Sequence, residues 1–128
     1  MHRAEIIACG LNEAALDRLQ TQVRKGGVWL RPVQHDRPCF DLAARNSSAV
    51  VILHLGRDLE KELGLLRRLT WLLPDCRCVV TGEEANPDLA GLAWDLGAAY
   101  VLFPPQSWEL LGEIALGLLP GSKTANPQ

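Results

Sequence analysis

Ala49-Val50-Val51-Ile52-Leu53 is the clearest strand in this sequence. All five of its residues are apolar, and three of them are β-branched. An uninterrupted run of this kind is typical of a parallel-sheet strand that is buried on both faces. It therefore predicts a central strand in an α/β fold.

A long helical pattern follows this strand, at about residues 58–73. Its leucines fall into stripes at helical spacing, which predicts the side that packs on the sheet. One stripe contains Leu59, Leu63, Leu66 and Leu73, and a second contains Leu65, Leu69 and Leu72. Pro74 ends the helix, because proline cannot continue it.

The same alternation of a short apolar run with a helical pattern extends over the chain. The other predicted strands are residues 5–9, 28–33, 77–81 and 99–103. The other predicted helices begin at Asn12, near Pro38, at Asn86-Pro87 and at Ser107, and they end near Gly26, Arg45, Gly97 and Leu119. Such alternation predicts an α/β domain with a parallel sheet. Pro32 places the second strand at a sheet edge, because proline cannot donate to a ladder.

The composition fits a single domain. The chain has 128 residues, of which 48% are hydrophobic and 22% are charged, and we expect one domain at residues 4–119 with a flexible tail at 120–128. A net charge of −2 argues against a nucleic-acid or membrane partner. We find neither a transmembrane run nor a signal peptide, and we therefore expect a cytosolic protein.

The four cysteines, Cys9, Cys39, Cys76 and Cys78, do not form a Cys-x-x-Cys pair. In a reducing compartment they are expected to be reduced and mostly buried. No histidine has metal-site spacing to them, so the sequence predicts no metal.

The segment Gly97-Ala98-Ala99-Tyr100-Val101-Leu102-Phe103-Pro104 is similar to the Gly-Ala-x-x-Tyr-x-x-Lys-Pro segment of receiver domains in bacterial two-component response regulators, with phenylalanine in place of lysine. Residues 49–55 resemble that family's third strand, which ends in the phospho-accepting aspartate, and residues 79–82 resemble its fourth strand. The resemblance covers about residues 4–119. It implies a flavodoxin-like, CheY-like fold, with five parallel strands in the order 2-1-3-4-5 and helices on both faces.

The resemblance also locates the phosphorylation site, and most of its residues are missing. His54 stands where the family has the aspartate, Cys9 and Gly10 stand where it has two acids, and Phe103 stands where it has the lysine. Thr81 alone keeps the family's residue type. Mg²⁺ prefers oxygen ligands, so we expect neither Mg²⁺ nor another cofactor. The chain is therefore interpreted as a pseudo-receiver that is not phosphorylated and is not an enzyme.

Other interpretations of the residues near this site are possible. His54 is either a pH-sensitive or ligand-contacting group, or a histidine whose nitrogens have local partners, which we favour. Glu83 and Glu84 either give a carboxylate to this site or form a solvated loop, which we favour. Cys9 has no basic neighbour in sequence that would favour a reactive thiolate.

The preferred function is a protein-interaction module that binds a protein partner or forms a homodimer. In the family, the surface made by the fourth helix, fifth strand and fifth helix commonly mediates such contacts. Here the fourth helix is expected to pack on the core through Leu89, Leu92, Ala93 and Leu96, with Trp94 pointing outward. The last helix has more leucine and isoleucine than one buried face needs. The interface candidates are Trp94, Tyr100, Trp108 and Leu116.

The alternative function is a ligand-sensing domain. Open α/β sheets bind ligands at the carboxyl ends of their strands. Cys9, His54, Thr81 and Phe103 would line such a pocket. Phe103 folded into it would argue against a ligand.

Overall fold

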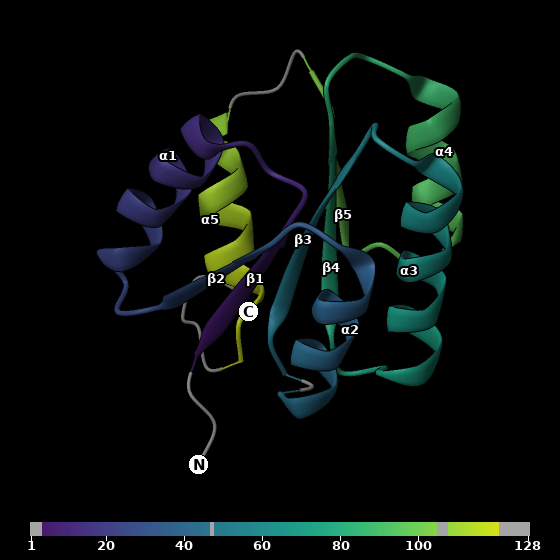
Figure 1. Cartoon of the computed structure of the whole chain (residues 1–128). Helices are drawn as coiled ribbons and strands as arrows, with labels where there is room; N and C mark the ends of the chain where they lie inside the picture. Colours follow the sequence, from purple (N-terminus) through teal and green to yellow (C-terminus); the bar gives the residue numbers. More distant parts are fainter. Residues whose placement is uncertain (1–3, 47, 105–107, 121–128) are drawn as a thin grey trace, which may run out of the picture.

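The computed structural model describes residues 4–46, 48–104 and 108–120. Along these residues, five strands alternate with five helices (Figure 1). In chain order they are β1 (Glu5–Cys9), α1 (Glu13–Arg24), β2 (Trp29–Val33), α2 (Asp36–Arg45), β3 (Val50–Leu55), α3 (Leu59–Leu72), β4 (Arg77–Gly82), α4 (Pro87–Asp95), β5 (Tyr100–Leu102) and α5 (Trp108–Leu118). The strands form one parallel sheet in the order β2-β1-β3-β4-β5. The predicted fold class and strand order are confirmed.

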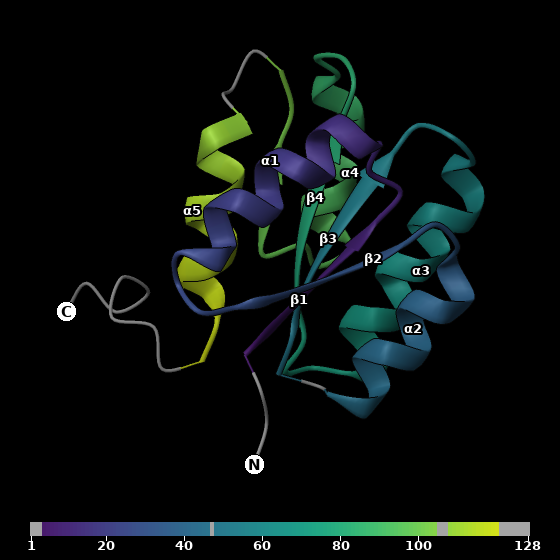
Figure 2. The ribbon, with the colours of Figure 1, turned by 60° about the vertical axis from the view of Figure 1, so that its left-hand side comes forward.

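Helices cover both faces of the sheet, so the core has two layers. Helices α1 and α5 pack on one face, and α2, α3 and α4 pack on the other (Figures 1 and 2). Because successive strand residues point to opposite faces, neighbouring residues such as Val51 and Ile52 of β3 belong to different layers. Apolar residues are therefore needed at every position of the central strands.

The central strand β3 is buried along most of its length and pairs with β1 and β4, as predicted. It extends to Leu55, beyond the predicted end at residue 53. The additional residues pair His54 with Thr81 and Leu55 with Gly82. This pairing brings His54 and Thr81 together at the carboxyl edge of the sheet.

Side-chain caps begin three of the helices. The Asn12 side chain accepts from Ala15 N at 2.8 Å, Asp58 from Lys61 N at 3.3 Å and Asn86 from Leu89 N at 3.1 Å. The predicted starts of these helices are therefore confirmed to within a residue. Helix α2 begins at Asp36, earlier than predicted, with Pro38 in its first turn, where proline is tolerated. The predicted Ser107 cap and the tail from 121 lie outside the described residues.

The predicted core sides of α3 and α4 were partly wrong. In α3, Leu65, Leu66 and Leu69 are fully buried, whereas Leu59 is 43% exposed and Leu72 is 62% exposed. In α4, Ala93 is buried but Leu92 is 43% exposed. Apolar residues occupy so many positions of these helices that periodicity alone does not fix which side faces the sheet.

Other predictions from the composition are tested by burial. All four cysteines are buried free thiols, as predicted. Within the described segments, none of the helices has the length and apolar character that a membrane span needs.

Candidate functional site

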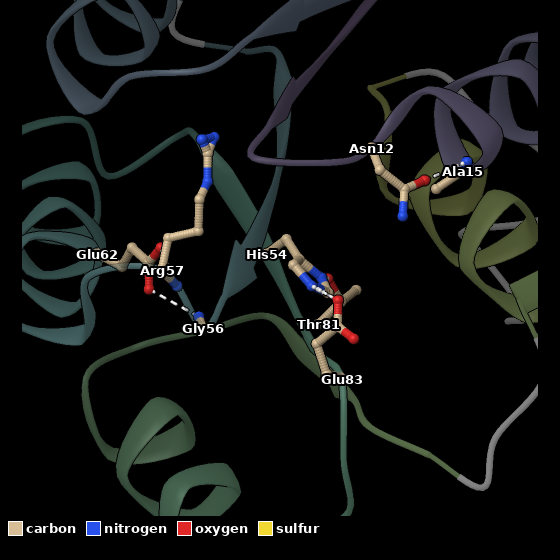
Figure 3. Close-up of polar contacts among 8 residues, drawn as sticks. All are labelled: Asn12, Ala15, His54, Gly56, Arg57, Glu62, Thr81 and Glu83. Carbon is tan, nitrogen blue, oxygen red and sulfur yellow. Dashed lines mark hydrogen bonds and ion pairs between the residues drawn. The ribbon is translucent and has the colours of Figure 1, made fainter.

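The candidate site lies at the carboxyl edge of the sheet, where β3 and β4 end. His54 Nδ1 lies 2.8 Å from Thr81 Oγ1, and His54 Nε2 lies 3.3 Å from Glu83 Oε2 (Figure 3). A carboxylate only accepts hydrogen bonds, so Nε2 carries the proton in this arrangement. In the neutral imidazole, Nδ1 then accepts from the Thr81 hydroxyl. Both ring nitrogens thus have local partners, in agreement with the interpretation that we favoured.

The loop after β1 passes close to His54. Gly10 has a φ of +84°, and a Cβ at this position would lie 3.3 Å from the His54 carbonyl oxygen. Neither Cys9 nor Gly10 has a carboxylate, and Cys9 is only 5% exposed. Among the described residues, no group of three or more histidine, cysteine, aspartate or glutamate side chains is arranged to hold a metal ion.

Phe103 packs into the core. Its side chain is 8% exposed, and it belongs to the layer on the side of α2, α3 and α4. A Cβ at Gly82 would lie 3.0 Å from the Phe103 ring, so the ring covers the end of β4. In the family pattern, one more residue separates Ala98 from Tyr100, but the spacing from Tyr100 to Pro104 keeps Phe103 at the lysine position.

The Glu62 carboxylate, on α3, fixes the β3–α3 loop. It accepts from the backbone N–H groups of Gly56 at 2.9 Å and Arg57 at 3.2 Å. The Arg57 guanidinium donates to Gln34 Oε1 at 2.8 Å, and Gln34 Nε2 donates to the Leu11 carbonyl at 3.2 Å. This chain of contacts links three loops at the same edge. We did not predict it, because each contact joins residues of different loops and has no local sequence signal.

A cleft of about 360 Å³ lies beside His54. Its lining combines apolar residues with residues from the loop contacts: Gly10, Leu11, Asn12, Ala15, Gln34, His54, Gly56, Arg57 and Glu83. Of the four residues expected to line one pocket, only His54 lines this cleft. Cys9 faces a neighbouring hollow of about 190 Å³ together with His54. Thr81 and Phe103 are buried behind the site instead.

Cys9 is also paired with a second thiol. The Cys39 thiol hydrogen-bonds to Cys9, which lowers the pKa of Cys9 and raises the pKa of Cys39. Burial and the charges of Glu62 and Asp36 oppose the lowering of the Cys9 pKa, and the Arg57 charge adds to it. The sequence showed no basic neighbour for this thiol because Arg57 reaches it only through the fold.

The interface candidates lie in different places. Trp94 is 47% exposed, and its ring meets the Tyr100 ring edge-on at a centroid distance of 5.7 Å. Leu116 lies against Gly26, where a Cβ would be 3.4 Å from a Leu116 methyl group, so this leucine packs at the end of α1. Trp108 is the first residue of α5, and its side chain lies outside the described part of the structure.

Comparisons with known proteins identify similar structures more clearly than similar sequences. No family model matches the chain. The DNA mismatch repair protein MutS of Thermus aquaticus is 39% identical over 103 residues, which make up 80% of this chain. The MutS protein of Thermus thermophilus is 37% identical over 103 residues. The chain spans only 12% of the length of these curated relatives, so the match does not place it in their family.

The structural matches cover whole domains. A response regulator from Thermotoga maritima has a TM-score of 0.78 at 17% identity, over 91% of this chain and 98% of that one. The signal receiver domain of a putative Luxo repressor protein from Vibrio parahaemolyticus has a TM-score of 0.76 at 17% identity, over 91% of both chains. The CheY-like protein tadZ from Pseudomonas aeruginosa has a TM-score of 0.74 at 19% identity, over 91% of this chain and 99% of that one.

Proposed function

We propose that this chain, which has the fold of response-regulator receiver domains, is a signalling module that binds a protein and is not switched by phosphorylation. The observation that carries the proposal is the contact between His54 Nδ1 and Thr81 Oγ1 at 2.8 Å. A histidine occupies the position of the phospho-accepting carboxylate, and it engages the hydroxyl that would otherwise contact a phosphoryl group.

The remaining residues of the site support the same proposal. Stabilising a phosphoryl group in transfer requires positive charge around its oxygens. Phe103 replaces the lysine and is buried, and Cys9 and Gly10 replace the acids that would hold a metal. The His54 imidazole is a nucleophile itself, but the Glu83 carboxylate beside Nε2 would repel an incoming phosphoryl group.

The surface around Trp94 supports protein binding. Trp94 and Leu92 are both about half exposed on α4, and the Tyr100 ring supports Trp94 from β5. Large aromatic side chains that remain on the surface are the typical anchors of protein interfaces. We propose that this surface, formed by α4, β5 and α5, contacts a protein partner or a second copy of the chain.

The test of the proposal is phosphorylation of the purified chain, measured by intact mass after incubation with acetyl phosphate and Mg²⁺. We expect no added phosphate on the wild type. We also expect none on the His54→Asp variant, because restoring the nucleophile leaves the metal ligands and the lysine missing. A Mg²⁺-dependent phospho-species on the wild type would overturn the proposal.

A second candidate function is small-ligand sensing, and the cleft of about 360 Å³ beside His54 favours it. Phe103 does not fill this cleft, so the expected obstacle to a ligand is absent there. Ligand-observed NMR with a mixture of polar metabolites tests it. A molecule whose binding is lost in the Arg57→Ala variant would support this function, and the absence of any bound molecule would reject it.

A further inference from the structure

A groove of about 520 Å³ runs along the outer side of α3, next to α2. It shares Asp36 and Lys61 with the hollow beside Cys9, but none of its lining residues belongs to the cleft beside His54 or to the surface around Trp94. Its lining on α3 is made of Lys61, Gly64, Arg67, Arg68, Trp71 and Leu72. Trp71 is 75% exposed and Leu72 is 62% exposed, more than any other large apolar residue in the described part of the chain.

Trp71 is not needed for the core of the protein. Helix α3 packs on the sheet through Leu65, Leu66 and Leu69. Trp71 follows Leu69 by a rotation of about 200° around the helix, which places it on the opposite side. The Arg67 guanidinium lies 5.5 Å from the centre of the Trp71 ring, at a distance typical of a cation–π contact. The tryptophan is thus held at the surface.

Gly64 is a second indication that another chain contacts the outer side of α3. It lies in the middle of α3, where glycine lowers helix stability relative to alanine. A Cβ at this position would meet nothing within 4 Å, so packing within the chain does not require glycine there. The bare backbone at Gly64 leaves room for another chain to approach the helix closely.

The charges of the groove are mainly positive, although the chain as a whole has a net charge of −2. Lys61, Arg67 and Arg68 face it, together with a single acid, Asp36. Asp36 is already paired with Arg68 at 3.2 Å. Among the described residues, neither Lys61 nor Arg67 belongs to an ion pair. A partner that covers the groove therefore needs acidic groups to match these two cations.

We propose that this groove binds an acidic, amphipathic helix of a protein partner. A large apolar side chain of the partner packs on Trp71 and Leu72, and its carboxylates pair with Lys61 and Arg67. The backbone of the partner helix passes over Gly64. This mode of recognition, in which an amphipathic helix lies in an apolar groove, recurs among peptide-binding proteins. The groove would give the chain a second binding surface beyond the one around Trp94.

The test uses a phage-displayed library of random helical peptides, selected on the full chain at low salt. We expect the selected peptides to be enriched in aspartate and glutamate around one large apolar residue. Their dissociation constants should rise about fivefold or more between 50 and 500 mM NaCl, because salt screens exposed charges. Trp71→Ala and Arg67→Glu should each weaken binding about tenfold. Trp29→Ala is the control, because Trp29 is an exposed tryptophan of β2 that does not line the groove, and it should leave binding unchanged.

Gly64→Leu separates binding from folding. The leucine raises helix propensity, so the melting temperature should be unchanged or higher, whereas peptide affinity should fall about tenfold as the groove fills. Several results would overturn the proposal. These are selected peptides without acidic enrichment, an equal loss of affinity in Trp29→Ala, or no binder at all. Two further results would reject the proposal by giving the groove a different occupant. One is self-association that Trp71→Ala abolishes, and the other is preferential binding of a single-stranded oligonucleotide.

Discussion

His54 and Thr81 form a polar pair in a part of the sheet that is otherwise apolar. Thr81 is 2% exposed, and in the described part of the chain His54 is the partner of its hydroxyl. A hydrogen bond of this kind contributes about 1 kcal/mol to stability, and an orphaned buried partner costs more. The pair therefore stabilises the end of β3.

Replacing Thr81 tests this contribution. We expect Thr81→Val to lower the free energy of unfolding by about 1–2 kcal/mol, because the hydrogen bond between Thr81 and His54 is lost while the side-chain volume is kept. The measurement is urea denaturation followed by circular dichroism. Glu83→Gln is the control, since the Glu83 side chain is 72% exposed and its contact with His54 lies in solvent. A loss in Glu83→Gln as large as that in Thr81→Val would contradict this account.

From the sequence, the site could be predicted only through the resemblance to receiver domains. The structure brings His54, Thr81 and Gly10 together at the carboxyl edge of the sheet and buries Phe103, and the family positions assigned to these residues stay a prediction. The sequence did not predict two other contacts at this edge. These are the hydrogen bond from Arg57 to Gln34 and the bonds from the backbone of Gly56 and Arg57 to Glu62, which depend on how the loops come together in the fold.

At the scale of elements, the sequence predicted the strands better than the orientation of the helices. A parallel strand buried on both faces leaves a continuous apolar run, which is easily recognised in β3. Helix α3 has so many leucines that two different sides fit the period. Leu72 was assigned to the core but lies at the surface, 62% exposed.

Paired leucine substitutions in α3 test its orientation. We expect Leu66→Ala to lower the free energy of unfolding by about 3 kcal/mol, because Leu66 is fully buried and its removal leaves a cavity. Leu72→Ala should change it by less than about 0.5 kcal/mol. Both values come from denaturant titration. Equal losses for the two variants would mean that α3 faces the sheet differently.

At the scale of the whole molecule, the surface around Trp94 is where we expect association. Trp94→Ala should weaken self-association or partner binding by at least about 1 kcal/mol, because an exposed aromatic is the best available anchor of an interface. Sedimentation velocity over a range of concentrations measures the self-association, and pull-down measures the partner. The melting temperature should stay close to that of the wild type, since Trp94 is 47% exposed.

Two results would argue against this surface. One is a wild-type chain that remains monomeric at every concentration and recovers no partner. The other is unfolding of Trp94→Ala, which would show that the tryptophan supports the core.

The edge strand β2 has a consequence for aggregation. Trp29 N–H bonds to the Ala4 carbonyl, on the side of β1, so by strand alternation Leu30 and Pro32 present their nitrogens to the open side of β2. Proline there removes an outward donor without removing a bond inside the sheet. An incoming strand from another molecule would find the hydrogen-bonding edge interrupted, which is how natural sheets resist edge-to-edge growth. Pro32→Val should leave the melting temperature nearly unchanged and shorten the lag time of thioflavin-monitored aggregation at 37 °C; an unchanged lag time would show that the edge is protected by other means.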